Sequence, residues 1–258
     1  MKRLLLSLAM VLALAAPSFA AEDIVVGVTP FPHKDIMLAA KPLLAKEGYN
    51  LVIKEFTDYV QPNMALASKQ LFANFFQHEP YLDNMNKEKK LDLVSIGKVH
   101  IEPLGVYSKK IKQLADLKKG NSISVPNDPT NEAGALRLLE ANGIIKIKPG
   151  ALVTVADITE NPLGLKFHEL DAAQLPRTLD DVTASVINTN FAGEAGLIPA
   201  RDALVMEGSE SPYANIVVVR NEDKDSPKAK ALMKAVQSPE VKAYIQKNLV
   251  ERGIVPVF

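Results

Sequence analysis

The regular alternation of strand-like and helix-like segments near the N-terminus constrains the fold of this chain most strongly. Apolar, β-branched runs at residues 24–28 and 51–56 predict strands, and apolar residues at helical spacing in 35–47 predict the helix that connects them. The aromatic run at 71–78 predicts a third buried strand, followed by a helix with Pro80 in its first turn. Because strands that alternate with helices pair in parallel through right-handed crossovers, we expect an α/β fold built on a mostly parallel sheet.

The first twenty residues have the pattern of an export signal rather than of a folded element. Lys2 and Arg3 precede an apolar stretch that is shorter than the about 20 residues a membrane span requires. Ser18 and Ala20 are the small residues expected before a cleavage site. We therefore expect residues 1–20 to be a signal peptide that is cleaved after Ala20, with an uncleaved membrane anchor as the alternative. The sequence contains no cysteine, so it offers neither a disulfide nor a thiol for a lipid anchor.

Charge and motif content narrow the classes of function. The 30 basic residues balance the 30 acidic residues and no basic stripe is visible, so we expect no nucleic-acid binding. The sequence lacks a glycine-rich phosphate loop, a G-x-S-x-G elbow and an H-E-x-x-H zinc motif. The four histidines share no short metal-ligand spacing, which leaves open whether they meet in space. With no positive evidence for them, we expect no catalytic residues, no metal site and no cofactor.

One segment is the best candidate for a crossover between two lobes. Residues 92–107 predict extended chain that glycine and proline interrupt, and the lysine-rich residues 109–120 predict a surface helix. A second strand-and-helix unit follows, and a strand at 216–219 is expected to return to the first lobe. We therefore expect lobe 1 to comprise residues 21–108 and 217–258, and lobe 2 to comprise residues 109–216.

Polar side chains recur where a predicted strand ends or a helix begins. These positions are Tyr59, Gln77, His78, Asn131, Asn188, Asn190 and Asn215, and they are joined by Arg137 on a predicted helix. In open α/β sheets, ligands bind at the carboxyl ends of the strands. An arginine fork suits a carboxylate, asparagine carbonyls suit an ammonium group, and aromatic rings suit an apolar or sulfur-containing tail. The set therefore indicates a cleft for a small zwitterion; the alternative is helix caps and a solvated arginine.

Several sequence blocks together resemble one known family. The blocks are D-Y-V-Q-P-N at 58–63, F-Q-H-E-P-Y-L at 76–82, P-N-D-P-T-N-E at 126–132, N-T-N-F-A at 188–192 and Y-A-N at 213–215. In this order they resemble the methionine-binding lipoprotein (NlpA-type) family, and the resemblance extends from residue 24 to the C-terminus. Members of that family are substrate-binding proteins of methionine ABC importers. The resemblance therefore implies the two-lobed periplasmic-binding-protein fold of type II, in which each lobe is a mixed, mostly parallel sheet flanked by helices.

The resemblance also implies roles for individual side chains and for partners. It implies that Tyr59, Phe76 and Tyr81 wall the pocket for the ligand's side chain. It implies polar contacts to the ends of the amino acid from His78, Arg137, Asn190 and Asn215, with Arg137 on the carboxylate, and further contacts from Asn131 and Asn188. The expected ligand is methionine, with the L enantiomer assumed and the D enantiomer left open. The expected partners are an ABC permease and its ATPase, and we expect a monomer whose lobes close over the ligand by hinge bending.

The chain departs from the family pattern at the expected cleavage site. Most members have a lipobox cysteine there, whereas this chain has Ser18-Phe19-Ala20-Ala21. We therefore expect a freely diffusing periplasmic protein without a lipid-anchor cysteine. Three alternative functions remain open at this point. They are a different cargo, such as another apolar amino acid or a methionine-containing dipeptide, an exported hydrolase or isomerase built on the same cleft, and an adhesin.

Overall fold

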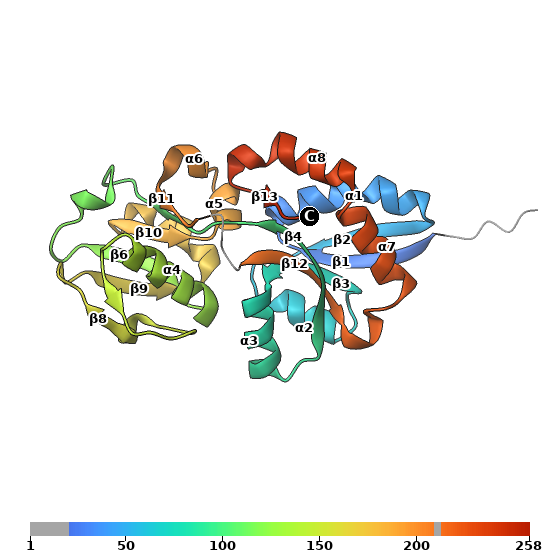
Figure 1. Ribbon diagram of the computed structural model, residues 1–258, viewed down its shortest axis with the longest axis horizontal. Helices are drawn as coiled ribbons and strands as arrows, with labels where there is room; N and C mark the ends of the chain where they lie inside the picture. The colour runs from blue at the N-terminus through green and yellow to red at the C-terminus, as the bar shows by residue number, and fades with distance from the viewer. Residues whose placement is uncertain (1–20, 209–212) are drawn as a thin grey trace, which may run out of the picture.

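The computed structural model describes residues 21–208 and 213–258 and shows two α/β lobes that lie side by side (Figure 1). Each lobe is built on one mixed sheet, which has six strands in the first lobe and five in the second. The predicted signal peptide falls on residues 1–20, outside the described residues. Within the described ranges, no helix combines the length and the apolar character that crossing a membrane would require.

The two sheets differ in strand order but share a mixed pattern of pairing. In spatial order, the first sheet is β13 (Val255–Pro256), β4 (Leu93–Ile101), β12 (Ala214–Arg220), β3 (Ala73–His78), β1 (Glu22–Val28) and β2 (Tyr49–Glu55). The second is β11 (Ala203–Met206), β5 (Gly105–Tyr107), β10 (Ala184–Ile187), β6 (Ser122–Pro126) and β9 (Lys166–Leu170), and β7 (Lys146–Ile147) and β8 (Ile158–Glu160) form a separate pair. β1 pairs in parallel with β2 and with β3, so the predicted parallel arrangement near the N-terminus is confirmed.

Helices cover both faces of the first sheet (Figure 1). The helices are α1 (Asp35–Lys46), α2 (Gln61–Ala67), α3 (Glu79–Lys89), α4 (Pro129–Ala141), α5 (Thr189–Glu194), α6 (Pro199–Asp202), α7 (Pro227–Val236) and α8 (Pro239–Asn248). α4, α7 and α8 begin with proline directly after a capping side chain: Asp128, Ser226 and Ser238 each accept a hydrogen bond from a backbone N–H of the first turn. Cap and proline together fix where these helices start. The capping side chain accepts from a backbone N–H that has no partner within the helix, and proline has no backbone N–H that would need one.

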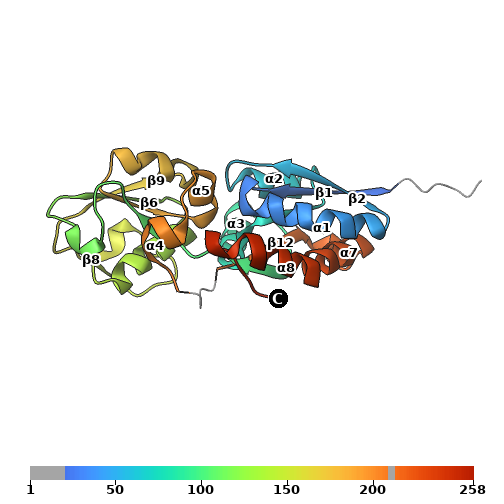
Figure 2. The ribbon, with the colours of Figure 1, turned by 90° about the horizontal axis from the view of Figure 1, so that it is seen from above.

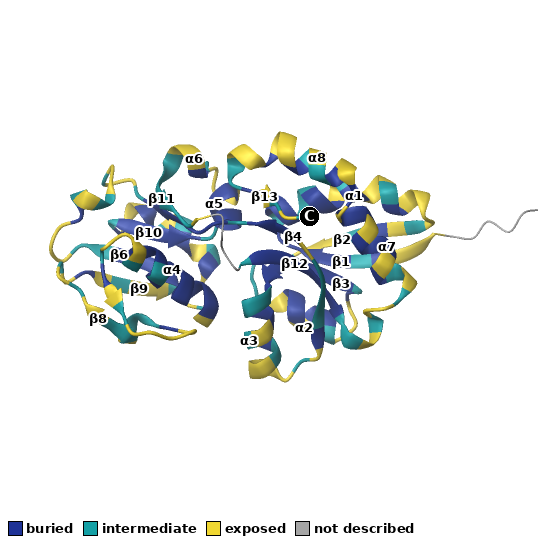
Figure 3. Ribbon diagram, viewed as in Figure 1, coloured by how far each residue is buried: buried dark blue, intermediate teal, exposed yellow. Residues whose placement is uncertain are grey.

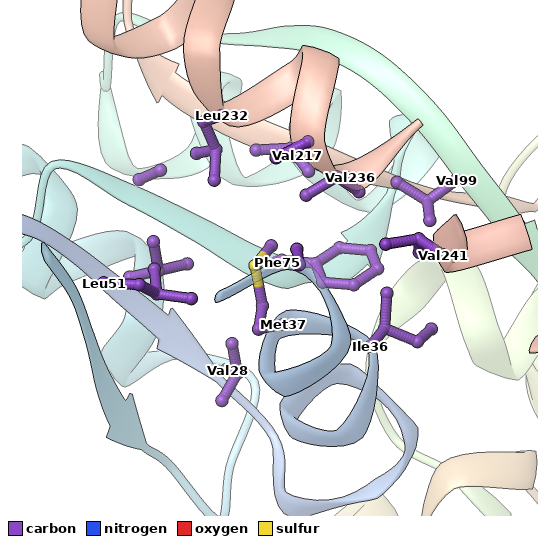
Figure 4. Close-up of a cluster of buried hydrophobic side chains, with 14 of the residues drawn as sticks. Val28, Ile36, Met37, Leu51, Phe75, Val99, Val217, Leu232, Val236 and Val241 are labelled. Atoms are coloured by element: carbon purple, nitrogen blue, oxygen red, sulfur yellow. The ribbon is translucent and has the colours of Figure 1, made fainter. Parts of the chain in front are cut away.

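The core of lobe 1 lies between the first sheet and helices α1, α7 and α8. Phe75 of β3 is fully buried there and lies beside Ile36 of α1 and Val241 of α8 (Figure 4). A smaller cluster under α2 and α3 covers the other face of the sheet and includes Leu66 and Leu82. The central strands of both lobes are buried, whereas exposed residues lie on the outward faces of the helices (Figure 3). The first sheet is thus buried on both faces, which explains its near-continuous apolar strands.

The chain passes between the two sheets twice. It leaves the first sheet at Ile101 and enters the second at Gly105, and it leaves the second at Met206 and re-enters the first at Ala214. These positions lie a few residues from the expected boundaries, because β5 belongs to the second sheet and β12 begins before residue 217. We propose that lobe 1 comprises residues 21–101 and 214–258 and that lobe 2 comprises residues 105–206.

The predicted helix at 109–120 is wrong, because only Leu114–Asp116 forms a short 3-10 turn. The hydroxyl of Ser108 accepts hydrogen bonds from the backbone N–H groups of Lys110 and Ile111, and these bonds hold a turn where the helix was expected. Ile111 packs with Leu114 against the core of lobe 2. Local side-chain bonds and burial of two apolar residues therefore replace the surface helix that the lysine pattern indicates.

Candidate functional site

A pocket lies where the two lobes meet. Eight of the nine side chains proposed from the sequence line it, and they are Tyr59, Phe76, His78, Tyr81, Asn131, Asn188, Asn190 and Asn215. Gln77, which the strand-end pattern also marked, lines it as well, and the further lining residues are Glu102, Leu104, Thr189, Glu207 and Tyr213. Figure 2 shows α5, which carries Asn190, on the side of lobe 2 that faces lobe 1.

The pocket lies at one edge of each sheet. His78 ends β3, and Asn215 of the antiparallel strand β12 pairs with it in register. Asn188 follows β10, and Asn131 lies in the first turn of the helix that follows β6. The polar side chains gather here because carboxyl ends of parallel strands share one edge of a sheet.

Three aromatic rings form one wall of the pocket. The ring centroid of Tyr59 lies 5.9 Å from that of Phe76 and 5.9 Å from that of Tyr81, and the Phe76 and Tyr81 centroids lie 6.0 Å apart. The Tyr81 hydroxyl donates to the Tyr59 carbonyl at 2.9 Å, which fixes the two rings relative to each other. Such a wall suits an apolar chain, and a thioether sulfur gains additional contact energy at ring edges.

A buried network fixes the orientation of His78 and Asn131. The Tyr81 backbone N–H donates to His78 Nδ1 at 3.2 Å, so Nδ1 carries no proton and Nε2–H is the donor. His78 Nε2 lies 3.2 Å from Asn131 Oδ1, which also accepts from Asn188 Nδ2 at 2.9 Å. Asn131 Nδ2 donates to the Asp128 carboxylate at 2.9 Å. Burial lowers the pKa of His78, so its ring remains a neutral hydrogen-bond donor.

The network leaves two amide atoms for a ligand. Within the described part of the chain, Asn188 Oδ1 and Asn190 Nδ2 are buried without a hydrogen-bond partner. The Tyr59 hydroxyl donates to Asn190 Oδ1 at 2.6 Å across the two lobes, and this bond assigns Nδ2 to the other side of the amide. A buried polar group without a partner costs about 1–3 kcal/mol. The pocket therefore offers one unsatisfied acceptor and one unsatisfied donor, a pattern that a zwitterion matches.

Three titratable residues lie behind Asn215. His33 Nε2 is 3.1 Å from Asn215 Oδ1 and 3.2 Å from Glu102 Oε1, and His100 Nε2 is 2.6 Å from the same carboxylate oxygen. Burial raises the pKa of Glu102 to about 7 and lowers the pKa of His33 to about 4. Both imidazoles are therefore neutral near pH 7, while the Glu102 carboxyl titrates there.

The same three groups are the nearest approach to a metal site among the described residues. The ligand atoms of His33, His100 and Glu102 lie within 4.8 Å of one another, although the sequence spacing predicted no metal site. The 2.6 Å contact between His100 and Glu102 has the length of a hydrogen bond. Two ligand atoms that each lie about 2.0–2.1 Å from a tetrahedral zinc ion are farther from each other than His100 Nε2 and Glu102 Oε1 are here. The observed geometry is therefore that of a hydrogen-bonded cluster.

Arg137 is the one proposed site residue that the structure does not bring to the pocket lining. Its guanidinium donates to the carbonyls of Gly150 and Ala151 at 2.7 and 2.6 Å. It also donates to the hydroxyl of Tyr213, which lines the pocket, at 3.2 Å. Arg137 thus lies directly behind a pocket residue, and its contact with a ligand carboxylate stays a prediction.

Sequence reasoning missed Glu102 and His33, although a signal for both was present. Each follows a strand of the first sheet, Glu102 after β4 and His33 after β1, at the same edge as His78. The strand-end rule that selected His78 would have selected them too, had it been applied to every strand.

The whole chain is similar to proteins of one family. The sequence model for the NlpA lipoprotein matches residues 24–258. Outer membrane lipoprotein 3 of Mannheimia haemolytica is 48% identical over 235 residues, which cover 89% of each chain. A nutrient binding protein from Burkholderia cenocepacia, solved bound to methionine, is 51% identical with a TM-score of 0.88, covering 91% of this chain and 100% of that one. A periplasmic substrate-binding protein of an ABC transporter from Coxiella burnetii is 46% identical with a TM-score of 0.87, over the same shares.

The names of these relatives correct the expected localisation. The matching family is described as a lipoprotein, and the Mannheimia haemolytica relative is named an outer membrane lipoprotein. The prediction of a freely diffusing periplasmic protein without a lipid anchor is therefore wrong, and we withdraw it. It relied on a single missing residue type at a cleavage site that lies outside the described residues.

The similarity to solved structures confirms the predicted fold. Both structural relatives are aligned over their full length, and one of them is described as a periplasmic substrate-binding protein. The two mixed sheets with flanking helices match that architecture. Because the family match runs from residue 24 to the C-terminus and the relatives are close to half identical, this chain belongs to the NlpA lipoprotein family.

Proposed function

We propose that this chain is the substrate-binding protein of an ABC importer and that it captures methionine between its two lobes. The observation that carries the proposal is the pocket itself, which combines an aromatic wall with two unsatisfied amide atoms. The wall accepts the thioether tail, and the amide atoms face the zwitterionic end. The family membership supports the same function, since one relative was solved bound to methionine and another belongs to an ABC transporter.

The pocket favours a zwitterion over an uncharged analogue because its polar atoms come from both lobes. Asn188 and Asn190 belong to lobe 2, whereas Tyr59 and His78 belong to lobe 1. A ligand that bridges the two sets stabilises the closed arrangement by its differential affinity for it. An analogue without one polar group leaves a buried atom unpaired, at a cost of about 1–3 kcal/mol.

Arg137 is part of the proposal as the partner of the ligand carboxylate. Its guanidinium is held by two backbone carbonyls and by the Tyr213 hydroxyl. It reaches the ligand either through Tyr213 or after its side chain rotates away from Gly150 and Ala151. A planar guanidinium can bind a carboxylate through two parallel hydrogen bonds, which gives this contact both strength and direction.

Thermal unfolding of ligand-stripped protein tests the proposal. The protein is unfolded in denaturant, dialysed, refolded and then heated with L-methionine, D-methionine, norleucine or leucine. A ligand at 100 times its dissociation constant stabilises the folded state by about 2.7 kcal/mol, so methionine should raise Tm. This rise should be clearly larger than the rise with norleucine, which lacks the sulfur that gains contact energy at the ring edges. Equal shifts for methionine and leucine would identify a general apolar amino acid as the cargo, and no shift for any of them would refute the proposal.

We further propose that the protein acts as a monomer and binds its ligand without converting it. Incubation of the protein with methionine, followed by mass spectrometry, should return the ligand unchanged. Light scattering should give the mass of a single chain. A chemically altered ligand would favour the hydrolase or isomerase interpretation of the cleft.

A further inference from the structure

Glu102 is a buried carboxylate that lines the pocket. Among the described residues, its ion-pair partners include no lysine or arginine. Its side chain is 7% exposed, and its ion-pair contacts are with His33 and His100. The low pKa values of the two histidines, about 4 and about 3, keep both rings neutral near pH 7. A buried carboxylate held by neutral donors lacks a balancing cation, and such a charge is costly unless it is paired.

The two histidines orient the carboxylate through one oxygen. The Thr29 hydroxyl lies 2.7 Å from His33 Nδ1 and can donate to it, which leaves Nε2–H of His33 shared between Asn215 Oδ1 at 3.1 Å and Glu102 Oε1 at 3.2 Å. His100 Nδ1 is buried without a partner in the described chain, whereas its Nε2 is 2.6 Å from the same oxygen. Both rings are therefore assigned as Nε2–H donors toward Oε1, and the backbone N–H of Asn190 also donates to this carboxylate. A carboxylate has about four lone-pair sites, so one remains for a ligand.

An aromatic ring keeps this cluster rigid. The edge-to-face contacts of Phe75 place its ring centroid 4.6 Å from that of His33 and 5.4 Å from that of His100. Phe75 and both histidines are fully buried. The donors thus have little freedom to turn away from Glu102, and the carboxylate is held in one place at the edge of the pocket.

We propose that Glu102 binds the ammonium group of the amino-acid ligand and that His33 and His100 act as positioning residues for its carboxylate. This inference rests on the proposed function, because it needs a ligand with an amino group. Glu207 also lines the pocket, and its carboxylate accepts from the Leu104 N–H at 3.4 Å. Glu102 is the better candidate because its charge is buried, oriented and unbalanced.

Proton release on binding is a direct consequence. The pKa of Glu102 is about 7 without ligand, so a large fraction is protonated at neutral pH, and an ammonium partner stabilises the ionised form. The other titratable groups that face Glu102 are Tyr59, Glu194, His33 and His100. Burial raises the pKa of Glu194 to about 7 as well, so a variant must identify which carboxyl releases the proton.

Calorimetric titrations of Glu102→Gln test the assignment with two ligands, methionine and 4-methylthiobutanoate, which lacks the amino group. Methionine should bind Glu102→Gln at least tenfold more weakly than wild type, whereas the deaminated ligand should change less than twofold. Glu88→Gln, at an exposed position of α3, is the matched control and should behave as wild type. Equal losses for the two ligands, or a selective loss in Glu207→Gln instead, would overturn the assignment.

Titrations at pH 7 in buffers of different ionisation enthalpy test the role of the histidines. Wild type should release protons when it binds methionine, and Glu102→Gln should release fewer. His100→Leu removes one donor to the carboxylate and should increase proton release, while His100→Gln retains a donor and should restore the wild-type value. Identical proton release in all four proteins would refute the positioning role. If wild type binds methionine but Glu102→Gln is unaffected, this inference fails alone; if wild type binds no methionine, the proposed function fails.

Discussion

The hydrogen bond from Tyr59 to Asn190 offers the sharpest test of how the two lobes hold a ligand. The Tyr59 hydroxyl, from lobe 1, donates to Asn190 Oδ1, from lobe 2, at 2.6 Å. Asn190 is 2% exposed, so water does not replace the bond when the hydroxyl is removed. Tyr59→Phe keeps the ring that packs on Phe76 and Phe191 and deletes only the donor.

The expected loss follows from the cost of a buried acceptor without a partner, about 1–3 kcal/mol. If the lobes close on the ligand, this cost appears in binding, and each 1.4 kcal/mol corresponds to a factor of about ten in affinity. Tyr59→Phe should therefore weaken methionine binding by about 5- to 150-fold in calorimetric titration. Tyr49→Phe, in the edge strand β2, is the matched control and should bind as wild type. Binding by Tyr59→Phe within twofold of wild type would refute the interlobe role of this bond.

Three further changes have expected outcomes. Gly193→Ala should lower the free energy of unfolding by about 1–3 kcal/mol in urea titrations, because a Cβ there would lie 2.4 Å from the Phe31 ring; an unchanged midpoint would contradict this close packing. Arg137→Ala should weaken methionine binding at least tenfold in calorimetry, and unchanged affinity would remove Arg137 from the proposed site. In ligand-free protein the folded-state pKa of Glu102 is raised from 4.5 to about 7, so its contribution to stability is complete below pH 4.5 and is lost as pH rises through 7. Wild type should therefore lose stability relative to Glu102→Gln over this pH range in denaturant titrations, and a constant difference would contradict the raised pKa.

Much of the fold is predictable where local signals and burial agree. The segment from residue 71 to 89 is an example, because its aromatic strand β3 ends at His78 and its helix begins at Glu79, as predicted. The segment 109–120 is the opposite case. Its lysine pattern indicates a helix, but the Ser108 hydroxyl holds a turn and the chain follows the surface of lobe 2 to bury Ile111 and Leu114. Tertiary contacts overrule propensity there.

The site was predictable where its residues follow strands with recognisable loops. Asn190 and Asn215 come from opposite lobes and line one pocket, as the resemblance implied. The strand-end rule marks His33 and Glu102 singly, but the contact between His33 and His100 behind Asn215 was not predictable, since most of lobe 1 separates these two residues in sequence. They meet only because the sheet order brings β4, β12, β3 and β1 together. No sequence spacing encodes that order.

Calorimetric titration of ligand-stripped protein with L-methionine tests the central claim most directly. We expect one binding site per chain with a dissociation constant of about 1 μM or tighter, which corresponds to about 8 kcal/mol or more. The double variant Asn188→Leu with Asn190→Leu removes the unsatisfied acceptor and donor and should abolish that binding while the protein remains folded by circular dichroism. Absence of saturable heat in the wild-type protein, or saturable binding that survives the double variant, would contradict the account.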